Sequence, residues 1–253
     1  MPRVLLPLLA ALGLLALGCQ ESGFNESKET EKPLKVQHAL GETKVPGQAQ
    51  EPLTLTVDAL DDTLALKVRP ARAAVPDAKL PAYLTEAGRG VSLMQPVTAS
   101  DLAAVDAVHP DLILGSADDQ GKLYEDLSRI APTVMTDGGG GQWKLNLRLL
   151  GEALGRTNDA EQLLTDYDRE AGEAREAIAG RPTVAVARMT ANGLRYAPRD
   201  SFAGTILADA GVTQVRGRGA DLTLRGDDSL WWGNGGVMAA RAALDELRAA
   251  LAG

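Results

Sequence analysis

The sequence predicts an α/β protein with two Rossmann-like lobes joined by one long helix. From Glu51 to Thr136, short apolar or β-branched runs alternate with helical segments, which is typical of a parallel sheet with helices on both faces. Residues 158–180 then carry one long amphipathic pattern. A new strand pattern begins at Thr183, so the long helix lies between two α/β segments.

The long helix, expected over Asn158–Gly180, has its apolar residues at steps of three and four, which keeps them on one stripe. Asn158 and Glu161 form a capping-box pattern at its start. Gly180 accepts a left-handed exit, and Pro182 cannot continue the helix. A helix of about 30 Å can connect two lobes, but an ordinary surface helix of one domain would show the same pattern. The stripe predicts that Leu163, Leu164 and Tyr167 are buried and that Asp166, Arg169 and Glu173 are exposed.

Length, charge and composition limit the functions that this chain can have. The 253 residues suffice for one large domain or two lobes. A net charge of −8 makes nucleic acid an unfavourable partner. The single cysteine excludes an intrachain disulfide, and two histidines are too few for a His-rich metal cage. No Ser–His–Asp, Cys–His or paired-carboxylate pattern is legible, so we expect no catalytic residue, no metal site and no cofactor.

Residues 1–19 form a secretory signal: basic Arg3, an apolar run from Val4 to Leu17, and Gly18 before Cys19. The run is too short for a stable membrane span. The signal resembles a bacterial lipobox, in which the cysteine is lipidated, although a plain signal with an incidental cysteine is the alternative. Residues 20–34 are polar and are expected to be a disordered tether. We therefore expect an extracytoplasmic lipoprotein, in the periplasm or on the outer face of the cell membrane.

The N-terminal lobe is expected over residues 35–157. It opens with two short strands around a turn, and DLILGS is its clearest strand. His38 and His109 have structural explanations, the latter as a helix stop before Pro110. The predicted strands are Leu53–Val57, Ala71–Val75, Val91–Met94, Asp111–Ser116 and Pro132–Thr136, and the predicted helices are Ala59–Leu66, Ser100–Val108 (capped by Ser100), Gln120–Ile130 and Trp143–Gly155.

The C-terminal lobe is expected over residues 181–253. PTVAVARM and GLRYAP predict two strands, and Asp221–Leu224 is a weaker third. A helix over Ser201–Ala210 is capped by Asp200 or Ser201 and stopped by Gly211. The chain closes with a helix over Val237–Leu251.

Several segments occur here in an order that resembles one family. They are HALGETKVP, LPAYL, HPDLILGS, GKLYEDLSRIAPTV, WKLNLRLLGEALG, AEQLLTDYD, RYAPRDSFAGTILADAG and WWGNGGVMAARAALDEL. Together they resemble the iron–siderophore substrate-binding lipoproteins of bacterial ABC importers. The resemblance implies two α/β lobes joined by one long helix, a ferric siderophore in the cleft, membrane subunits of an importer as partners, and a monomer.

The resemblance also indicates candidate ligand contacts. Arg188 ends a strand, where a cation can face the cleft, and Tyr196 lies near a strand end. An aromatic residue of the WW motif, Trp231 or Trp232, lines the cleft in relatives, and flat rings suit a bulky ligand. Packing is the alternative for Tyr196 and one of the tryptophans. Where relatives carry arginines that face the ligand, this chain has Met94 and Asp119, and where relatives carry a docking carboxylate it has Ala103.

The second lobe is shorter than the family pattern. Relatives have further strand–helix units between the segment that matches ILADAG and the final aromatic motif, whereas here Val212–Gly219 leads almost directly to that motif. We therefore expect a truncated C-terminal lobe that depends on the long helix for stability. The leading hypothesis is capture of ferric siderophores for an ABC importer. The alternatives are a cobalamin or haem carrier of the same fold, or a degenerate paralogue that does not transport.

Overall fold

The N-terminal sheet has five parallel strands in the order β5-β4-β3-β6-β7. The computed structural model describes residues 32–251 except 179, 218, 226–227 and 234, so the predicted signal peptide, Cys19 and most of the predicted tether lie outside it. The order reverses between β3 and β6, which makes their carboxyl ends the topological switch point. The strands are β3 (Pro52–Thr54), β4 (Arg72–Ala74), β5 (Leu93–Met94), β6 (Leu112–Ser116) and β7 (Thr133–Thr136).

Helices connect these strands, as the alternating pattern predicts. An antiparallel hairpin precedes the sheet. We call residues 34–153 the N-terminal half. Its remaining elements are β1 (Leu34–His38), β2 (Gly41–Val45), α1 (Val57–Ala65), α2 (Leu102–Asp106), α3 (Ala117–Gln120), α4 (Tyr124–Ile130), α5 (Trp143–Ala153) and several 3-10 turns.

Several predicted boundaries in this half were wrong, two of them because of local capping. The strand predicted to reach Val57 ends at Thr54, because the Thr56 hydroxyl accepts the backbone N–H of Ala59 and starts α1. Ser100 does not cap the next helix, since a capping box between Thr98 and Asp101 starts a 3-10 turn ahead of α2. The helix predicted over 120–130 is divided into α3 and α4 by a 3-10 turn.

The C-terminal half, residues 183–251, is built on β8 (Thr183–Thr190). The first half of β8 pairs in parallel with two short strands, and its last four residues pair antiparallel with β9. Ser201 rather than Asp200 caps the following helix, because its hydroxyl accepts the N–H of Gly204. β10 and α8 were not predicted, since two and four residues show no periodicity. The elements are β9 (Gly193–Tyr196), α7 (Phe202–Asp209), β10 (Thr213–Gln214), β11 (Leu222–Leu224), α8 (Asp228–Trp231) and α9 (Val237–Leu251).

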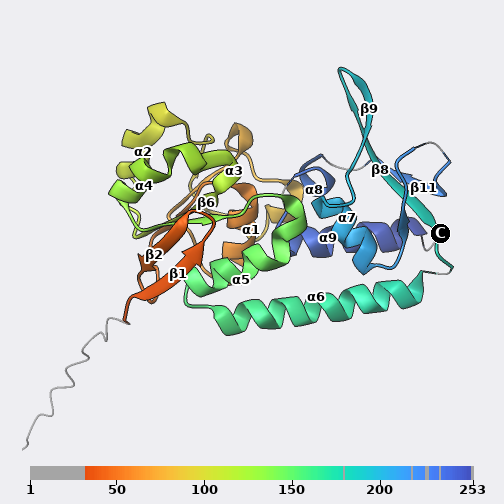
Figure 1. The fold of residues 1–253 in the computed structure, drawn as a ribbon, viewed down its shortest axis with the longest axis horizontal. Coiled ribbons are helices and arrows are strands. Elements are labelled where there is room, and N and C mark those ends of the chain that lie inside the picture. The colour runs from red at the N-terminus through yellow and green to blue at the C-terminus, as the bar shows by residue number, and fades with distance from the viewer. Residues whose placement is uncertain (1–31, 179, 218, 226–227, 234, 252–253) are drawn as a thin grey trace, which may run out of the picture. The chain divides into compact units, whose positions relative to one another are not determined.

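Helix α6 (Thr157–Ala177) connects the two halves along the chain and packs against α5, α7 and α9 (Figure 1). The predicted N-cap was wrong by two residues: Arg156 occupies the N-cap position without a side-chain hydrogen bond, and Asn158 lies inside the first turn. The predicted end was also wrong: α6 ends at Ala177 and Ile178 already has an extended backbone, although Gly180 has the positive φ, 74°, that was expected of it. Within the described part of the chain, no helix combines the length and the apolar character needed to cross a membrane.

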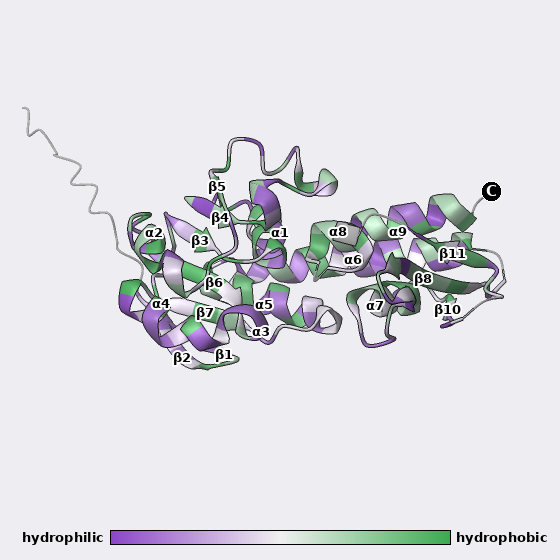
Figure 2. Ribbon diagram, turned by 90° about the horizontal axis from the view of Figure 1, so that it is seen from above, coloured by the Kyte–Doolittle hydropathy of each residue, from purple (hydrophilic) through white to green (hydrophobic). Residues whose placement is uncertain are grey.

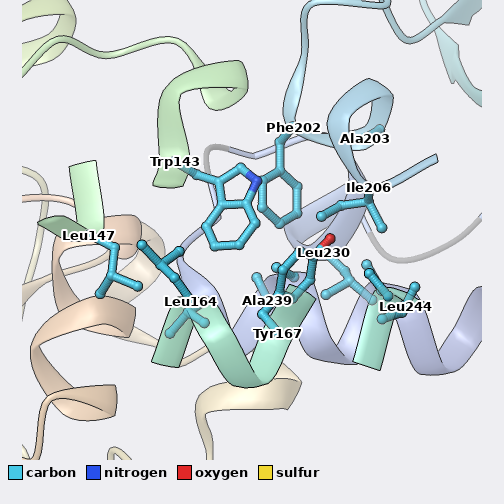
Figure 3. Close-up of a cluster of buried hydrophobic side chains, with 14 of the residues drawn as sticks. Trp143, Leu147, Leu164, Tyr167, Phe202, Ala203, Ile206, Leu230, Ala239 and Leu244 are labelled. Atoms are coloured by element: carbon cyan, nitrogen blue, oxygen red, sulfur yellow. The ribbon is translucent and has the colours of Figure 1, made fainter. Parts of the chain in front are cut away.

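One hydrophobic core runs through both halves, and Trp143 lies in it (Figure 3). The Trp143 ring, from the first residue of α5, meets Tyr167 of α6 edge-on at 4.8 Å between centroids and Phe202 of α7 at 6.2 Å. Its Nε1–H donates to the Thr205 hydroxyl at 3.2 Å. Figure 2 shows how hydrophobic and hydrophilic residues share helices such as α1 and α9, as expected when one face is buried.

A second link between the halves is polar. Asp61 of α1 accepts the backbone N–H groups of Met238 and Ala239 at 2.8 and 2.9 Å, and Asp62 accepts that of Val237 at 2.9 Å. Two buried carboxylates of the N-terminal half therefore cap the start of α9. Gly236 permits the approach, because a Cβ there would lie 2.4 Å from Asp62 Oδ1.

The stripe of α6 gives a testable prediction. Leu164 and Tyr167 are buried and Arg169 and Glu173 are exposed, as predicted, whereas Leu163 and Asp166 are both half-buried. Leu164→Ala is expected to lower the free energy of unfolding by about 3 kcal/mol, since it leaves a cavity in the shared core. Arg169→Ala, its control, should change it by less than about 0.5 kcal/mol, because exposed ion pairs contribute little. Urea denaturation of both variants measures this, and equal effects would refute the assigned stripe.

Candidate ligand-binding site

The hairpin of β8 and β9 carries two arginines directly opposite each other. Arg188 and Arg195 are Cα partners in the antiparallel register, and both are exposed. Like charges in this arrangement repel and destabilise a hairpin. Arg216, in the loop after β10, is also exposed and lines the same cavity. Among the residues that the structure describes, none of the three forms an ion pair with a carboxylate, so their charges are available to an anion.

These arginines line a cavity of about 800 Å³, which we call the basic cavity. The Arg188 guanidinium lies over the Trp232 ring, 4.5 Å from its centroid. Stacking on an aromatic face holds a guanidinium in place while its N–H groups stay free to bind carboxylate-like oxygens. The wall consists of Arg188, Thr190, Asn192, Leu194, Arg195, Tyr196, Pro198, Arg216 and Trp232.

A second cavity of about 930 Å³ lies at the carboxyl ends of β3, β4, β5 and β6, and we call it the acidic cavity. This is where an open parallel sheet binds ligands. Its charged residues are Asp58, Asp77, Lys79 and Asp119. Burial raises the pKa of the Asp58 carboxyl. Burial, together with neighbouring Asp118, raises the pKa of Asp119.

The backbone of the acidic cavity is unusual at one loop. Asp77, between β4 and β5, has a φ of 55°, and Ala78 has a φ of 48°. Non-glycine residues adopt this left-handed conformation rarely, and such residues concentrate at ligand sites. The conformation places Asp77 on the cavity wall with Lys79.

The two cavities are adjacent. Trp232 lines the basic cavity, and the next residue, Gly233, lines the acidic one. The linings of the two cavities therefore include consecutive residues at this point of the chain.

The structure brings together some of the predicted site residues and separates others. Arg188, Tyr196 and Trp232 share the basic cavity, and Asp119 lines the acidic one. Trp231 is 1% exposed and belongs to the core. Met94 is half-buried and packs against the smaller core cluster beneath the N-terminal sheet.

Sequence reasoning missed Arg195, Arg216 and Asp77. Arg195 could have been found from the hairpin register, since a short turn between two strands places it opposite Arg188. Arg216 and Asp77 lie in loops that give no periodic signal. Neither histidine lines the basic or the acidic cavity. His38 hydrogen-bonds Thr43 and Tyr124, and His109, with a φ of 53°, follows α2. Over the described ranges, no group of three or more His, Cys, Asp or Glu side chains is placed to hold a metal ion.

Comparison with known proteins places these features in a wider context. Residues 74–226 match a family described as periplasmic binding protein. The chain is 30% identical over 209 residues to a probable siderophore-binding lipoprotein, YfiY, of Bacillus subtilis, covering 81% of this chain and 64% of the relative. It is 30% identical over 170 residues to an achromobactin-binding periplasmic protein of Dickeya dadantii, covering 64% and 55%. The chain therefore spans between half and two thirds of the length of these relatives.

Solved structures show the same fold. SirA of Staphylococcus aureus, complexed with staphyloferrin B, superposes with a TM-score of 0.76 at 22% identity, covering 86% of this chain and 98% of that chain. The petrobactin-binding protein YclQ of Bacillus subtilis superposes with a TM-score of 0.72 at 16% identity, covering 87% and 99%.

Proposed function

The chain belongs to the periplasmic binding protein family, and from this premise we propose that it captures ferric siderophores outside the cytoplasm and delivers them to the membrane subunits of an ABC importer. Relatives named for siderophore binding support the proposal. Members of this family are binding proteins, and the arginines that line the basic cavity are suited to binding an anion.

The observation that carries the proposal is the cluster of three arginines in the basic cavity. Siderophores hold iron through anionic oxygens, which a delocalised cation with several N–H donors suits well. Arg188 and Arg195 repel each other across the hairpin, and an anionic chelate would relieve that repulsion. The Trp232 ring offers a flat surface for a bulky ligand.

The proposal extends to attachment at the membrane. Cys19 follows an apolar run and a small residue, and we infer that it is lipidated and that the protein acts as a monomer on the outer face of the membrane or in the periplasm. Several acyl chains anchor a protein more stably than one. Mass spectrometry of the mature N-terminus tests this, and an unmodified terminus beyond Cys19 would contradict it.

Removal of Arg188 tests the proposed function. One charge-assisted hydrogen bond contributes about 1.5–3 kcal/mol, so Arg188→Ala is expected to weaken binding of an anionic ferric siderophore by about 10–100-fold. Quenching of tryptophan emission measures binding, because Trp232 lies against the arginine. Haem and cobalamin are titrated in parallel.

The matched control is Arg181→Ala, which removes an exposed arginine that lines neither cavity. It should leave binding unchanged. If wild-type protein binds no member of a panel of ferric siderophores, or if Arg188→Ala binds as well as Arg181→Ala, the proposed function is wrong.

A further inference from the structure

We propose that the acidic cavity binds an uncharged carbonyl group carried on an apolar molecule or arm, and that the side-chain amide of Gln120 is the donor that selects it. The cavity lies at the carboxyl ends of β3, β4, β5 and β6, where open parallel sheets bind ligands. It shares no lining residue with the basic cavity, so its ligand can be tested without a siderophore.

Gln120, the last residue of α3, is a buried polar residue that lines the acidic cavity and is only 5% exposed. Its Oε1 atom accepts the backbone N–H group of Ser116 at 3.0 Å. Because that N–H group can bond only to an oxygen, it fixes the orientation of the amide. The Nε2 atom, which carries two N–H donors, has no hydrogen-bond acceptor among the residues that the structure describes.

The strands beneath Gln120 hold its amide in this orientation. Gly115 of β6 leaves space for it, since a Cβ there would lie 3.0 Å from Gln120 Oε1 and 3.1 Å from Met135 Sδ. A ligand that covers the Nε2 donor removes its hydrogen bonds to water, and this is costly unless the ligand supplies an acceptor. The fixed donor therefore favours a ligand with an acceptor at this point.

The rest of the wall indicates what kind of acceptor this is. Asp58, Asp77 and Asp119 line the same cavity together with Lys79, and Asp119 immediately precedes Gln120 in α3. Carboxylates close to the donor disfavour an anionic acceptor, and an ammonium group offers no acceptor at all. Most of the remaining wall consists of leucine, valine, alanine and proline. A neutral carbonyl on an apolar group therefore complements this cavity.

The test uses three small probes of similar shape. Acetophenone has a carbonyl oxygen, α-methylstyrene has a CH2 group in its place, and benzoate has an anionic carboxylate. Each is titrated into the full chain labelled with nitrogen-15, and the side-chain NH2 signals of Gln120 are followed by NMR. Acetophenone is expected to shift these signals and to bind about tenfold more tightly than either of the other probes, because both leave the buried donor without a neutral acceptor.

Gln120→Glu is the matched variant, since it has nearly the same shape, keeps an oxygen for the Ser116 N–H group and replaces the donor by an acceptor at pH 8. It should abolish the preference for acetophenone over α-methylstyrene. The control is Gln95→Glu, which adds the same charge at an exposed residue next to the cavity but outside its wall. It should keep the preference. A merely structural role of Gln120 would change both affinities equally and leave their ratio intact.

A siderophore loaded with diamagnetic gallium(III) identifies the source of the carbonyl group. If it shifts the Gln120 signals and excludes acetophenone, the carbonyl belongs to an arm of the chelate, whereas binding of acetophenone alongside it indicates a separate molecule.

Four results would overturn the role of Gln120: equal affinity of wild-type protein for acetophenone and α-methylstyrene, tighter binding of benzoate, no shift of the Gln120 signals, or a preference that survives Gln120→Glu. Failure of wild-type protein to bind any ferric siderophore would overturn the proposed function alone.

Discussion

Trp143→Ala is expected to lower the free energy of unfolding by about 3–5 kcal/mol. The ring is 1% exposed and lies between α5, α6 and α7, where it meets Tyr167 and Phe202 edge-on. Its removal leaves a cavity where the two halves join and takes away the donor to Thr205. Urea denaturation followed by circular dichroism measures the loss.

A conservative variant separates the contributions at this position. Trp143→Phe keeps an aromatic ring but loses the N–H group, so its effect should be clearly smaller than that of alanine. Because the same core continues through both halves, Trp143→Ala should also keep a single unfolding transition. A loss below about 1 kcal/mol for Trp143→Ala, or two separate transitions, would contradict the role assigned to this residue.

Asp61→Ala is expected to lower the free energy of unfolding by about 2–5 kcal/mol, because each buried N–H group left without an acceptor costs about 1–3 kcal/mol. The groups are those of Met238 and Ala239, in the first turn of α9. The control is Asp101→Ala, which removes a half-buried carboxylate that caps a turn within the N-terminal half, where a lost cap costs only about 1 kcal/mol. A smaller decrease in the free energy of unfolding for Asp61→Ala than for Asp101→Ala would contradict this role of Asp61.

The carboxylate pair also predicts how stability depends on pH. Burial raises the pKa of Asp61 from 3.8 to about 7, although the N–H groups of α9 act in the opposite direction. Burial and the charge of Asp61 raise the pKa of Asp62 as well. Asp58 on the same helix and Tyr83 lie close by. Between about pH 4 and 7, the folded state therefore binds more protons at Asp61 than the unfolded state.

This contribution stabilises the fold at low pH and is lost as pH rises through the folded pKa. Asp61→Asn is uncharged and keeps one acceptor, so its stability should lack this component. The free energy of unfolding of wild type minus that of Asp61→Asn should thus decrease from pH 4.5 to pH 7.5. A difference that stays constant or increases over the same range, measured by urea denaturation, would show that the pair is ionised in the folded state and would contradict this prediction.

The sequence predicted those parts of the fold that rest on long periodic patterns. The stripe of α6, the strand β6 and the bounds of α9 agree with the prediction, because each repeats its pattern over several residues. Caps were harder to predict: Thr56, Thr98 and Ser201 compete with equally suitable neighbours, and only the backbone geometry decides.

The candidate site was predictable only in part, for a different reason. Tyr196 could be named from its strand end and Trp232 from the aromatic motif. Arg188 was named as a strand end, which was wrong because β8 continues to Thr190, but all three residues line one wall. The residues of the acidic cavity could not be predicted together, because they come from four separate loops whose positions only the structure gives. The hydrogen bonds of Asp61 and Asp62 to α9 could not be predicted from the sequence, since the partners are separated by more than 170 residues and no local pattern relates them.

The capping of α9 by Asp61 and Asp62 of α1 has a consequence for the order in which parts of the chain fold. The N–H group that Asp62 accepts lies 175 residues further along the chain, so this cap cannot form while the ribosome or the export machinery still holds the end of the chain. Contacts at such separation slow folding, because their loop entropy is lost before they form. A late-closing chain stays unfolded for longer, which suits passage through a secretion channel. Pulsed hydrogen exchange during refolding measures this: the amides of Met238 and Ala239 should become protected in the same slow phase as those of α1.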